Sequence, residues 1–234
     1  LWGNLYCNQG CYMKKIFSFL LVIISICSLL LYGCSSNEQN SRQSEKLSIV
    51  TSIFPYYDLA RNIVGDKADV KLLLSPGNEP HHYEPSPSDI VAIEECDIFI
   101  YNGGESDEWV ENVLDSLENK NITVLKMTDY VSLLNEKNPD HTDGDEADEH
   151  IWTSVRNAEQ LVKKISDVVT EKDNKNKSEY ENNTNQYLLS LDELDKEFTD
   201  VVNNKKRDTV VFGDRFPFLY FICLLYTSPS PRDY

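Results

Sequence analysis

Short apolar runs rich in β-forming residues alternate with helical patterns along residues 47–169. The apolar runs predict strands at 47–52, 70–74, 97–101 and 123–127. Apolar residues at helical spacing predict helices at 56–64, from Pro87 onward, at 108–117 and at 158–169. Alternating strands and helices form βα units, in which the strands run parallel and helices cover the sheet. The chain is therefore predicted to adopt an α/β fold.

A longer helical pattern follows, with apolar residues every three or four positions over 177–203. At about 1.5 Å per residue such a helix is roughly 40 Å long, and a strand-like run follows at 208–212. We interpret the helix as a link, at 175–206, between a first lobe at 47–174 and the start of a second lobe at 207–222. The second parallel-sheet lobe would then be largely missing. An amphipathic surface helix has the same periodicity and is the alternative.

The N-terminal region has the composition of an export signal. Lys14 and Lys15 follow Met13 and precede an apolar run that ends near Gly33 and Cys34. Residues 13–33 thus resemble a bacterial lipoprotein signal, in which Cys34 is lipidated. An uncleaved N-terminal anchor helix is the alternative. Residues 1–12 are interpreted as translated upstream sequence and residues 34–46 as a linker.

The C-terminal residues 223–234 resemble translated sequencing adapter, and a genuine short tail is the alternative. We therefore expect the natural protein to continue beyond about Ile222. With both ends set aside, Cys96 is the one cysteine left in the folded body. A cysteine-rich metal site is thereby excluded from that body.

Acidic residues dominate the charge of the chain, with 39 Asp plus Glu against 22 Lys plus Arg and a formal net charge of −17. Nucleic acid is excluded as a partner, because binding it requires clustered cationic side chains. An acidic surface favours cations instead. The acidic segment 135–149 has no apolar periodicity and is predicted to be a solvated loop.

Histidines suggest the chemistry of the chain, and there are four: His81, His82, His141 and His150. His81 lies in a proline-rich segment between a predicted strand and a capped helix, and His150 follows the acidic segment. Open α/β folds bind ligands in loops at the carboxyl edge of the sheet. A single loop histidine is usually a surface residue, but a pair suits a divalent transition ion, zinc first.

Three segments together resemble the zinc and manganese substrate-binding lipoproteins of ABC importers. They are IVTSIFP at 49–55, PHHYEPSPSD at 80–89 and EHIW at 149–152, and the resemblance covers about 47–221. It implies two α/β lobes joined by a long rigid helix, with the ion in the cleft between them. It also implies that His81 and His150 are ligands from the first lobe.

The third and fourth ligands implied by the resemblance do not match this sequence as closely. Many relatives have a histidine where this chain has Asp214, which is the candidate third ligand. A carboxylate there would favour harder ions such as manganese relative to an all-imidazole site. Asp214 could instead pair with Arg215 or cap a helix, and a fourth ligand is expected beyond Ile222. Relatives also carry a metal-collecting loop before the second ligand. The side chains in the corresponding place here are His141, Asp143, Asp145 and Glu146.

The resemblance implies a binding protein, not an enzyme. We expect a monomer held by a lipid anchor on the extracellular face of the bacterial cytoplasmic membrane. It would capture Zn²⁺, or alternatively Mn²⁺, and pass the ion to the permease of an ABC importer. The alternatives from other classes are a secreted zinc-dependent hydrolase and a binding protein for a metal chelate.

Overall fold

The computed structural model describes residues 46–75, 77–119, 121–136, 146–207, 209, 211 and 217–225. Several residues singled out in the sequence lie outside these ranges: Cys34, His141, Asp143, Asp145 and Asp214. The side chains of His82 and Glu146 are likewise not described. Their predicted roles therefore stay predictions.

A four-stranded parallel sheet forms the centre of the described chain. Its strands are β1 (Leu47–Thr51), β2 (Ala68–Leu72), β3 (Ile98–Tyr101) and β4 (Thr123–Lys126), in the spatial order β2-β1-β3-β4. All three neighbouring pairs are parallel, which confirms the predicted α/β class. Only β2 is shifted from its predicted position, because the buried Leu73 and Leu74 lie just beyond the strand.

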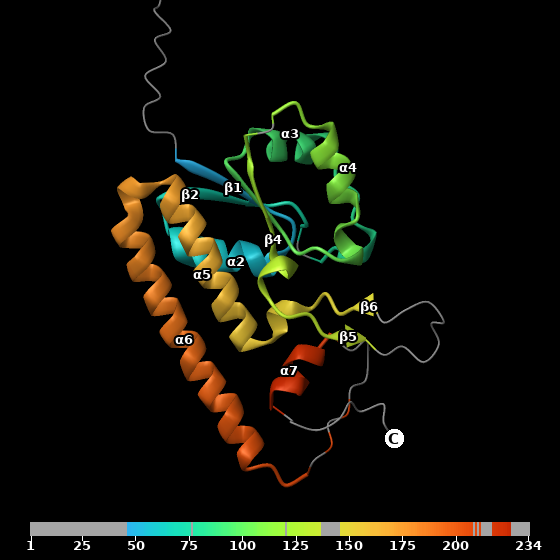
Figure 1. Cartoon of the computed structure of the whole chain (residues 1–234), viewed down its shortest axis with the longest axis vertical. Helices are drawn as coiled ribbons and strands as arrows, with labels where there is room; N and C mark the ends of the chain where they lie inside the picture. Colours follow the sequence, from blue (N-terminus) through green and yellow to red (C-terminus); the bar gives the residue numbers. More distant parts are fainter. Residues whose placement is uncertain are drawn as a thin grey trace, which may run out of the picture. The chain divides into compact units, whose positions relative to one another are not determined.

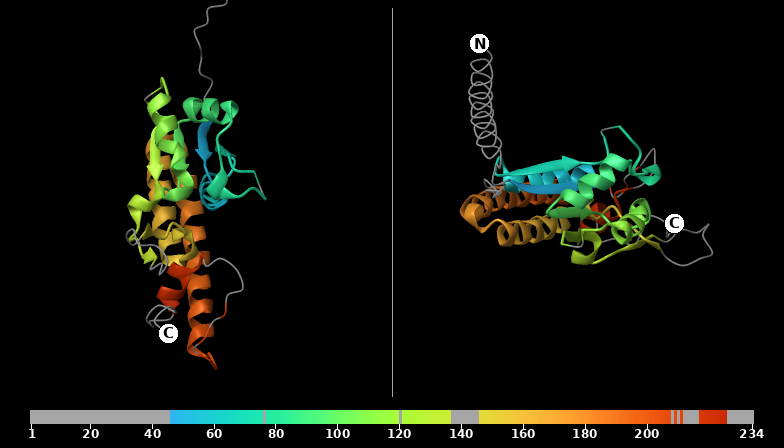
Figure 2. Two further views of the ribbon diagram at one scale, coloured as in Figure 1. Left: turned by 90° about the vertical axis from the view of Figure 1, so that its right-hand side faces the viewer. Right: turned by 90° about the horizontal axis from the view of Figure 1, so that it is seen from above.

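Helices cover both faces of this sheet (Figures 1 and 2). One face packs against α2 (Phe54–Val64) and α5 (Val155–Lys172), and the other against α3 (Pro87–Glu95) and α4 (Trp109–Ser116). Successive side chains along β3 point to opposite faces of the sheet. Ile98 and Ile100 pack towards α2 and α5, whereas Phe99 packs towards α3 and α4. A strand buried on both faces explains the continuous apolar sequence of β3.

The N-terminus of α3 fixes the end of the proline-rich loop. Ser86 caps the helix and accepts the backbone N–H of Asp89, whose carboxylate accepts the Ser86 N–H in return. Pro87 occupies the first helical turn, as predicted. The Tyr83 hydroxyl also donates to the Asp89 carboxylate over 3.0 Å, which ties the loop to the capped helix.

The long helix α6 (Lys177–Asn203) has the bounds predicted from its periodicity. It lies beside α5, and both views agree on this pairing (Figures 1 and 2). Tyr180, Thr184 and Leu191 form its buried side, and Val201 near its end is 69% exposed. A further helix, α7 (Leu219–Leu225), contacts α6 through the Phe198 and Phe221 rings, whose centroids are 4.8 Å apart.

Two predictions need correction. The segment 135–149 is not a simple solvated loop, because its ends pair as the antiparallel strands β5 (Asn135–Glu136) and β6 (Glu146–Ala147). Asp148 and Glu149 after β6 are buried, and their carboxylates accept hydrogen bonds from the His150 and Ser106 backbone N–H groups. Of the strand expected at 208–212, only Thr209 and Val211 are described, and neither lies in a strand.

Short 3₁₀ helices complete the described structure: η2 (Pro80–His82), η3 (Glu105–Asp107), η4 (Met127–Tyr130), η5 (Ile151–Thr153) and η6 (Asn174–Asn176). Within the described residues, no helix is both long and apolar enough to cross a membrane.

Candidate metal centre

A pocket of about 620 Å³ lies at the carboxyl edge of the parallel sheet. Ile53 follows β1, His81 lies on the connection after β2, and Asn102 directly follows β3. The chain leaves β1 and β3 in opposite directions across the sheet, and this switch point is where open α/β folds bind ligands. The lining residues are Ile53, Glu79, Pro80, His81, Asn102, Ser106, Asp107, Glu149, His150, Trp152, Pro217 and Phe218. This described lining includes acidic groups but no Lys or Arg, which suits a cation.

His81 is presented by η2, which begins at Pro80 and therefore has little backbone freedom. Its Nδ1 lies 3.0 Å from the Ser106 Oγ on η3 and 3.4 Å from the Glu149 Oε1. The side chain remains 29% exposed, so it is accessible from the pocket.

His150 is held from the other side by the residue two positions before it. The Asp148 Oδ1 accepts the backbone N–H of His150 over 2.7 Å and lies 3.1 Å from its Nδ1. A carboxylate can only accept, so Nδ1 carries a hydrogen, and in the neutral ring Nε2 then keeps its lone pair. The Trp152 ring packs 5.5 Å from the imidazole, centroid to centroid, and limits its movement.

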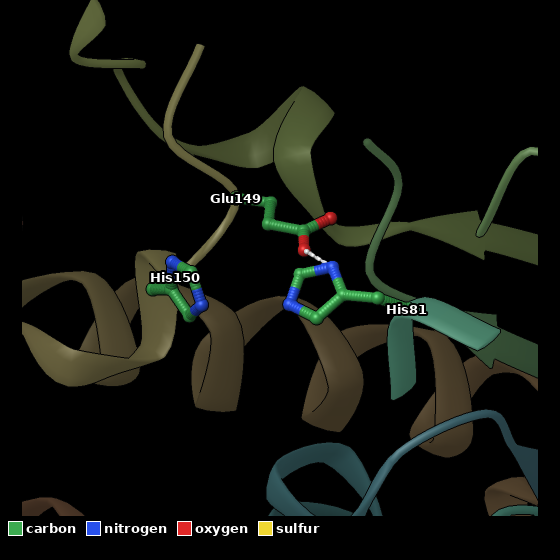
Figure 3. A group of neighbouring side chains, drawn as sticks. All are labelled: His81, Glu149 and His150. Carbon is green, nitrogen blue, oxygen red and sulfur yellow. Dashed lines mark ion pairs between the residues drawn. The ribbon is translucent and has the colours of Figure 1, made fainter. Parts of the chain in front are cut away.

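The structure brings His81 and His150 together, as the sequence predicted for a pair of ligands. Their ring centroids are 6.3 Å apart, and a ring nitrogen of each faces the other residue in Figure 3. In the described part of the chain, His81, Glu149 and His150 form the group whose potential ligand atoms all lie within 4.8 Å of one another. Two imidazoles and a carboxylate are a donor set that zinc accepts.

Glu149 is the site residue that sequence reasoning missed. Its side chain is only 10% exposed, and its Oε2 accepts the Ser106 N–H over 3.1 Å. Its Oε1 accepts the Ser106 hydroxyl. Gly104, at φ +103°, allows this packing, since a Cβ there would lie 2.8 Å from the Glu149 Oε2. Its position next to His150 was the available signal, but the surrounding acidic run suggested solvent exposure.

A buried hydrogen-bond chain fixes Glu149 to the sheet edge. The Asn102 Nδ2 donates to the Glu149 carbonyl over 2.9 Å, and the Tyr56 hydroxyl donates to the Asn102 Oδ1. The Asp107 carboxylate accepts the N–H groups of Asn102 and Gly103 over 2.8 and 3.0 Å. Burial raises the pKa of Asp107 to about 6, and the Glu149 charge contributes less to this rise.

Tyr220 on α7 connects a late segment of the chain to this pocket. Its hydroxyl donates to the Asp148 carbonyl over 2.7 Å and accepts the Leu134 N–H over 3.1 Å. Pro217 and Phe218, which follow the predicted third ligand Asp214 in sequence, line the pocket. Asp214 itself lies outside the described residues, so its role as a ligand stays a prediction.

Comparison with known proteins places this architecture in a family. Residues 49–222 match the sequence model of the ZnuA family, whose description is zinc-uptake complex component A, periplasmic. The chain belongs to the ZnuA family. The matched range includes His81, His150, α6 and all of the parallel sheet except the first two residues of β1.

Among the ZnuA-family relatives is the zinc-binding lipoprotein AdcA of Streptococcus pneumoniae, 34% identical over 85% of this chain and 40% of AdcA. The manganese ABC transporter substrate-binding lipoprotein PsaA of Streptococcus mitis is 31% identical over 82% of this chain and 62% of PsaA. The crystal structure of the Zn(II)-bound ZnuA-like domain of S. pneumoniae AdcA superposes with a TM-score of 0.68 and 32% identity. That superposition covers 77% of this chain and 64% of the domain. The chain thus spans less than two thirds of each of these relatives.

Proposed function

We propose that this chain is the substrate-binding component of an ABC importer and captures a divalent transition-metal ion as cargo. The pairing of His81 and His150 across one pocket at the switch point carries this proposal. Proline on one side and Asp148 on the other hold the two rings in place, so few degrees of freedom are lost when an ion binds. Membership of the ZnuA family supports the same function.

Zinc is the first candidate for the cargo and manganese the second. Two imidazoles favour zinc among the common divalent ions. Asp214 as a third ligand would add a carboxylate, which shifts preference towards the harder manganese ion. Both metals appear in the names of relatives, AdcA for zinc and PsaA for manganese.

We further propose which residues bind the ion and how the chain is anchored. His81 and His150 bind the ion directly, Asp214 joins them, and a collecting loop around His141 raises the local cation concentration. A monomeric chain anchored through a lipid on Cys34 would present the ion to its permease at the extracellular face of the membrane. AdcA of S. pneumoniae and PsaA are both named lipoproteins, which supports the anchor.

The histidine pair can be tested by measuring zinc and manganese affinity with a competing chelator. His81→Ala and His150→Ala should each weaken zinc binding by more than about 100-fold, beyond the 10- to 100-fold typical of a residue that only supports a ligand. His82→Ala is the matched control, since it removes an adjacent imidazole, and should change affinity by less than about threefold. A His82 effect as large as that of His81 would reverse the ligand assignment.

Two further readouts separate the other classes of function. Zinc-dependent hydrolysis of model peptides or esters would indicate a hydrolase and contradict the transport proposal. Native mass spectrometry of the loaded chain distinguishes a bare ion from a chelate, and we expect the mass of the bare ion.

A further inference from the structure

The contact between Ser106, Glu149 and His81 determines where the protons lie. The Ser106 hydroxyl has one hydrogen, and its Oγ lies within hydrogen-bond distance of both the Glu149 Oε1 and the His81 Nδ1. An ionised carboxylate can only accept, so the hydroxyl hydrogen goes to Glu149. The 3.0 Å contact with His81 then requires Nδ1–H to donate to the Ser106 Oγ.

This arrangement assigns a tautomer to the neutral His81 ring. With the hydrogen on Nδ1, the lone pair available for a metal lies on Nε2. Figure 3 shows the Nδ1 of His81 turned to Glu149 and the other ring nitrogen turned towards His150. The lone pair is therefore directed to the space between the two imidazoles.

We propose that Glu149, acting through Ser106, is a positioning residue that fixes the Nδ1–H tautomer of His81 and so directs Nε2 to the cargo ion. The consequence for metal affinity rests on the proposed function, whereas the tautomer itself does not. In this proposal Glu149 supports His81 and does not bind the ion itself, since both of its oxygens already accept hydrogen bonds from Ser106. Carboxylates behind metal-binding histidines orient the ring and raise the basicity of its lone pair.

The substitution Glu149→Gln tests the direction of the two hydrogen bonds from His81 through Ser106 to Glu149, because the shapes of the two side chains are nearly the same. The amide oxygen can still accept the Ser106 N–H, but the amide N–H₂ then donates to the Ser106 Oγ. The hydroxyl hydrogen is thereby released towards the His81 Nδ1, and the ring should change to its Nε2–H tautomer. Long-range ¹H–¹⁵N correlation spectra of the metal-free chain near pH 8 measure this directly.

Three other variants complete the experiment. Ser106→Ala should remove the preference for Nδ1–H, whereas Ser106→Thr should keep it because the hydroxyl remains. Glu105→Gln is the matched control, since it neutralises an exposed carboxylate on the same 3₁₀ helix. It should leave the His81 spectrum unchanged. If Glu149→Gln also leaves His81 in the Nδ1–H form, Glu149 does not fix the tautomer through Ser106 and the proposal is wrong.

Zinc affinity provides the second readout. Glu149→Gln and Ser106→Ala should weaken zinc binding by about 10- to 100-fold, and Ser106→Thr should stay within about threefold of the parent. A loss in Glu149→Gln as large as that in His81→Ala, with an unchanged tautomer, would make Glu149 a direct ligand and overturn the proposal. Failure of the parent chain to bind either zinc or manganese would contradict the proposed function alone, since the tautomer is measured without metal.

Discussion

At the scale of single residues, the buried Asp107 carboxyl group gives the pocket a pH dependence. It is 5% exposed and accepts two backbone N–H groups, but these bonds do not fully replace water around the charge. Its pKa is therefore about 6 in the folded chain, compared with an ordinary value of 3.8. The folded state holds this proton more tightly than the unfolded state.

Asp107→Asn should therefore change stability in a pH-dependent way. Between pH 4 and 6 the folded parent binds more protons than its unfolded form, so the Asp107 contribution to stability falls as the pH rises. The Asn variant has no carboxyl group to ionise at this position. The difference between its free energy of unfolding and that of the parent should therefore increase by up to about 3 kcal/mol from pH 4 to pH 6. Urea unfolding of the metal-free chains measures the difference. An exposed control, Glu111→Gln, should show no such rise, and a flat difference for Asp107→Asn would contradict the prediction.

At the scale of elements, the short β5–β6 ladder joins the two ends of residues 137–145 just before the metal centre. Asn135 pairs with Ala147, and the buried Asp148 and Glu149 follow immediately. Because the ladder holds its two ends together, residues 137–145 can be replaced by a two-residue turn such as Asn-Gly without moving the carboxylates.

Replacing residues 137–145 by Asn-Gly should slow metal capture but preserve equilibrium affinity within about threefold. Loop carboxylates raise the local cation concentration, an effect screened within about 8 to 10 Å at physiological salt. Stopped-flow association at low and high salt, together with chelator competition, measures both quantities. Asp148→Asn in the intact loop is the contrasting variant and should reduce affinity. Loss of tight binding after the replacement would show that His141 or a loop carboxylate is a direct ligand.

The sequence predicts those elements whose signal is local. Periodicity defines α6 correctly, and the cap residues Ser86 and Asp89 locate α3. The run at 70–74 marks burial and not strand pairing, so β2 was placed too late. Neither the β5–β6 ladder nor α7 was predicted. The two-residue strands of the ladder have no apolar alternation, and α7 packs against partners far away in sequence, such as Leu134.

The candidate site shows the same limit. His81 and His150 were identified from their motifs and do lie together. Glu149 was not, since its burial depends on Ser106 and Gly104 from a different connection of the fold. Composition indicates a solvated carboxylate, and only the three-dimensional arrangement supplies the donors that allow it to be buried.

At the scale of the whole molecule, the proposed anchor at Cys34 determines where the pocket operates. Cys34→Ser in a bacterial host should release the protein from membranes or leave an unprocessed precursor, because two or three acyl chains are needed for firm attachment. Membrane fractionation and metabolic labelling with a fatty acid measure this. Cys96→Ser is the control, since Cys96 is buried in the core and should not affect labelling. Lipid labelling that persists in Cys34→Ser would exclude this anchor.

The hydrogen bonds of Tyr220 have a consequence for the order in which the protein is built. The ribosome makes the sheet, both histidines and their carboxylates before it makes Tyr220, which binds the Leu134 N–H and the Asp148 carbonyl across 86 and 72 residues of sequence. Contacts over such separations form late, since a long loop must close first. The nascent chain can thus gather its imidazoles at the sheet edge first, and Pro217 and Phe218 join the described lining of the pocket only when the segment around Tyr220 docks.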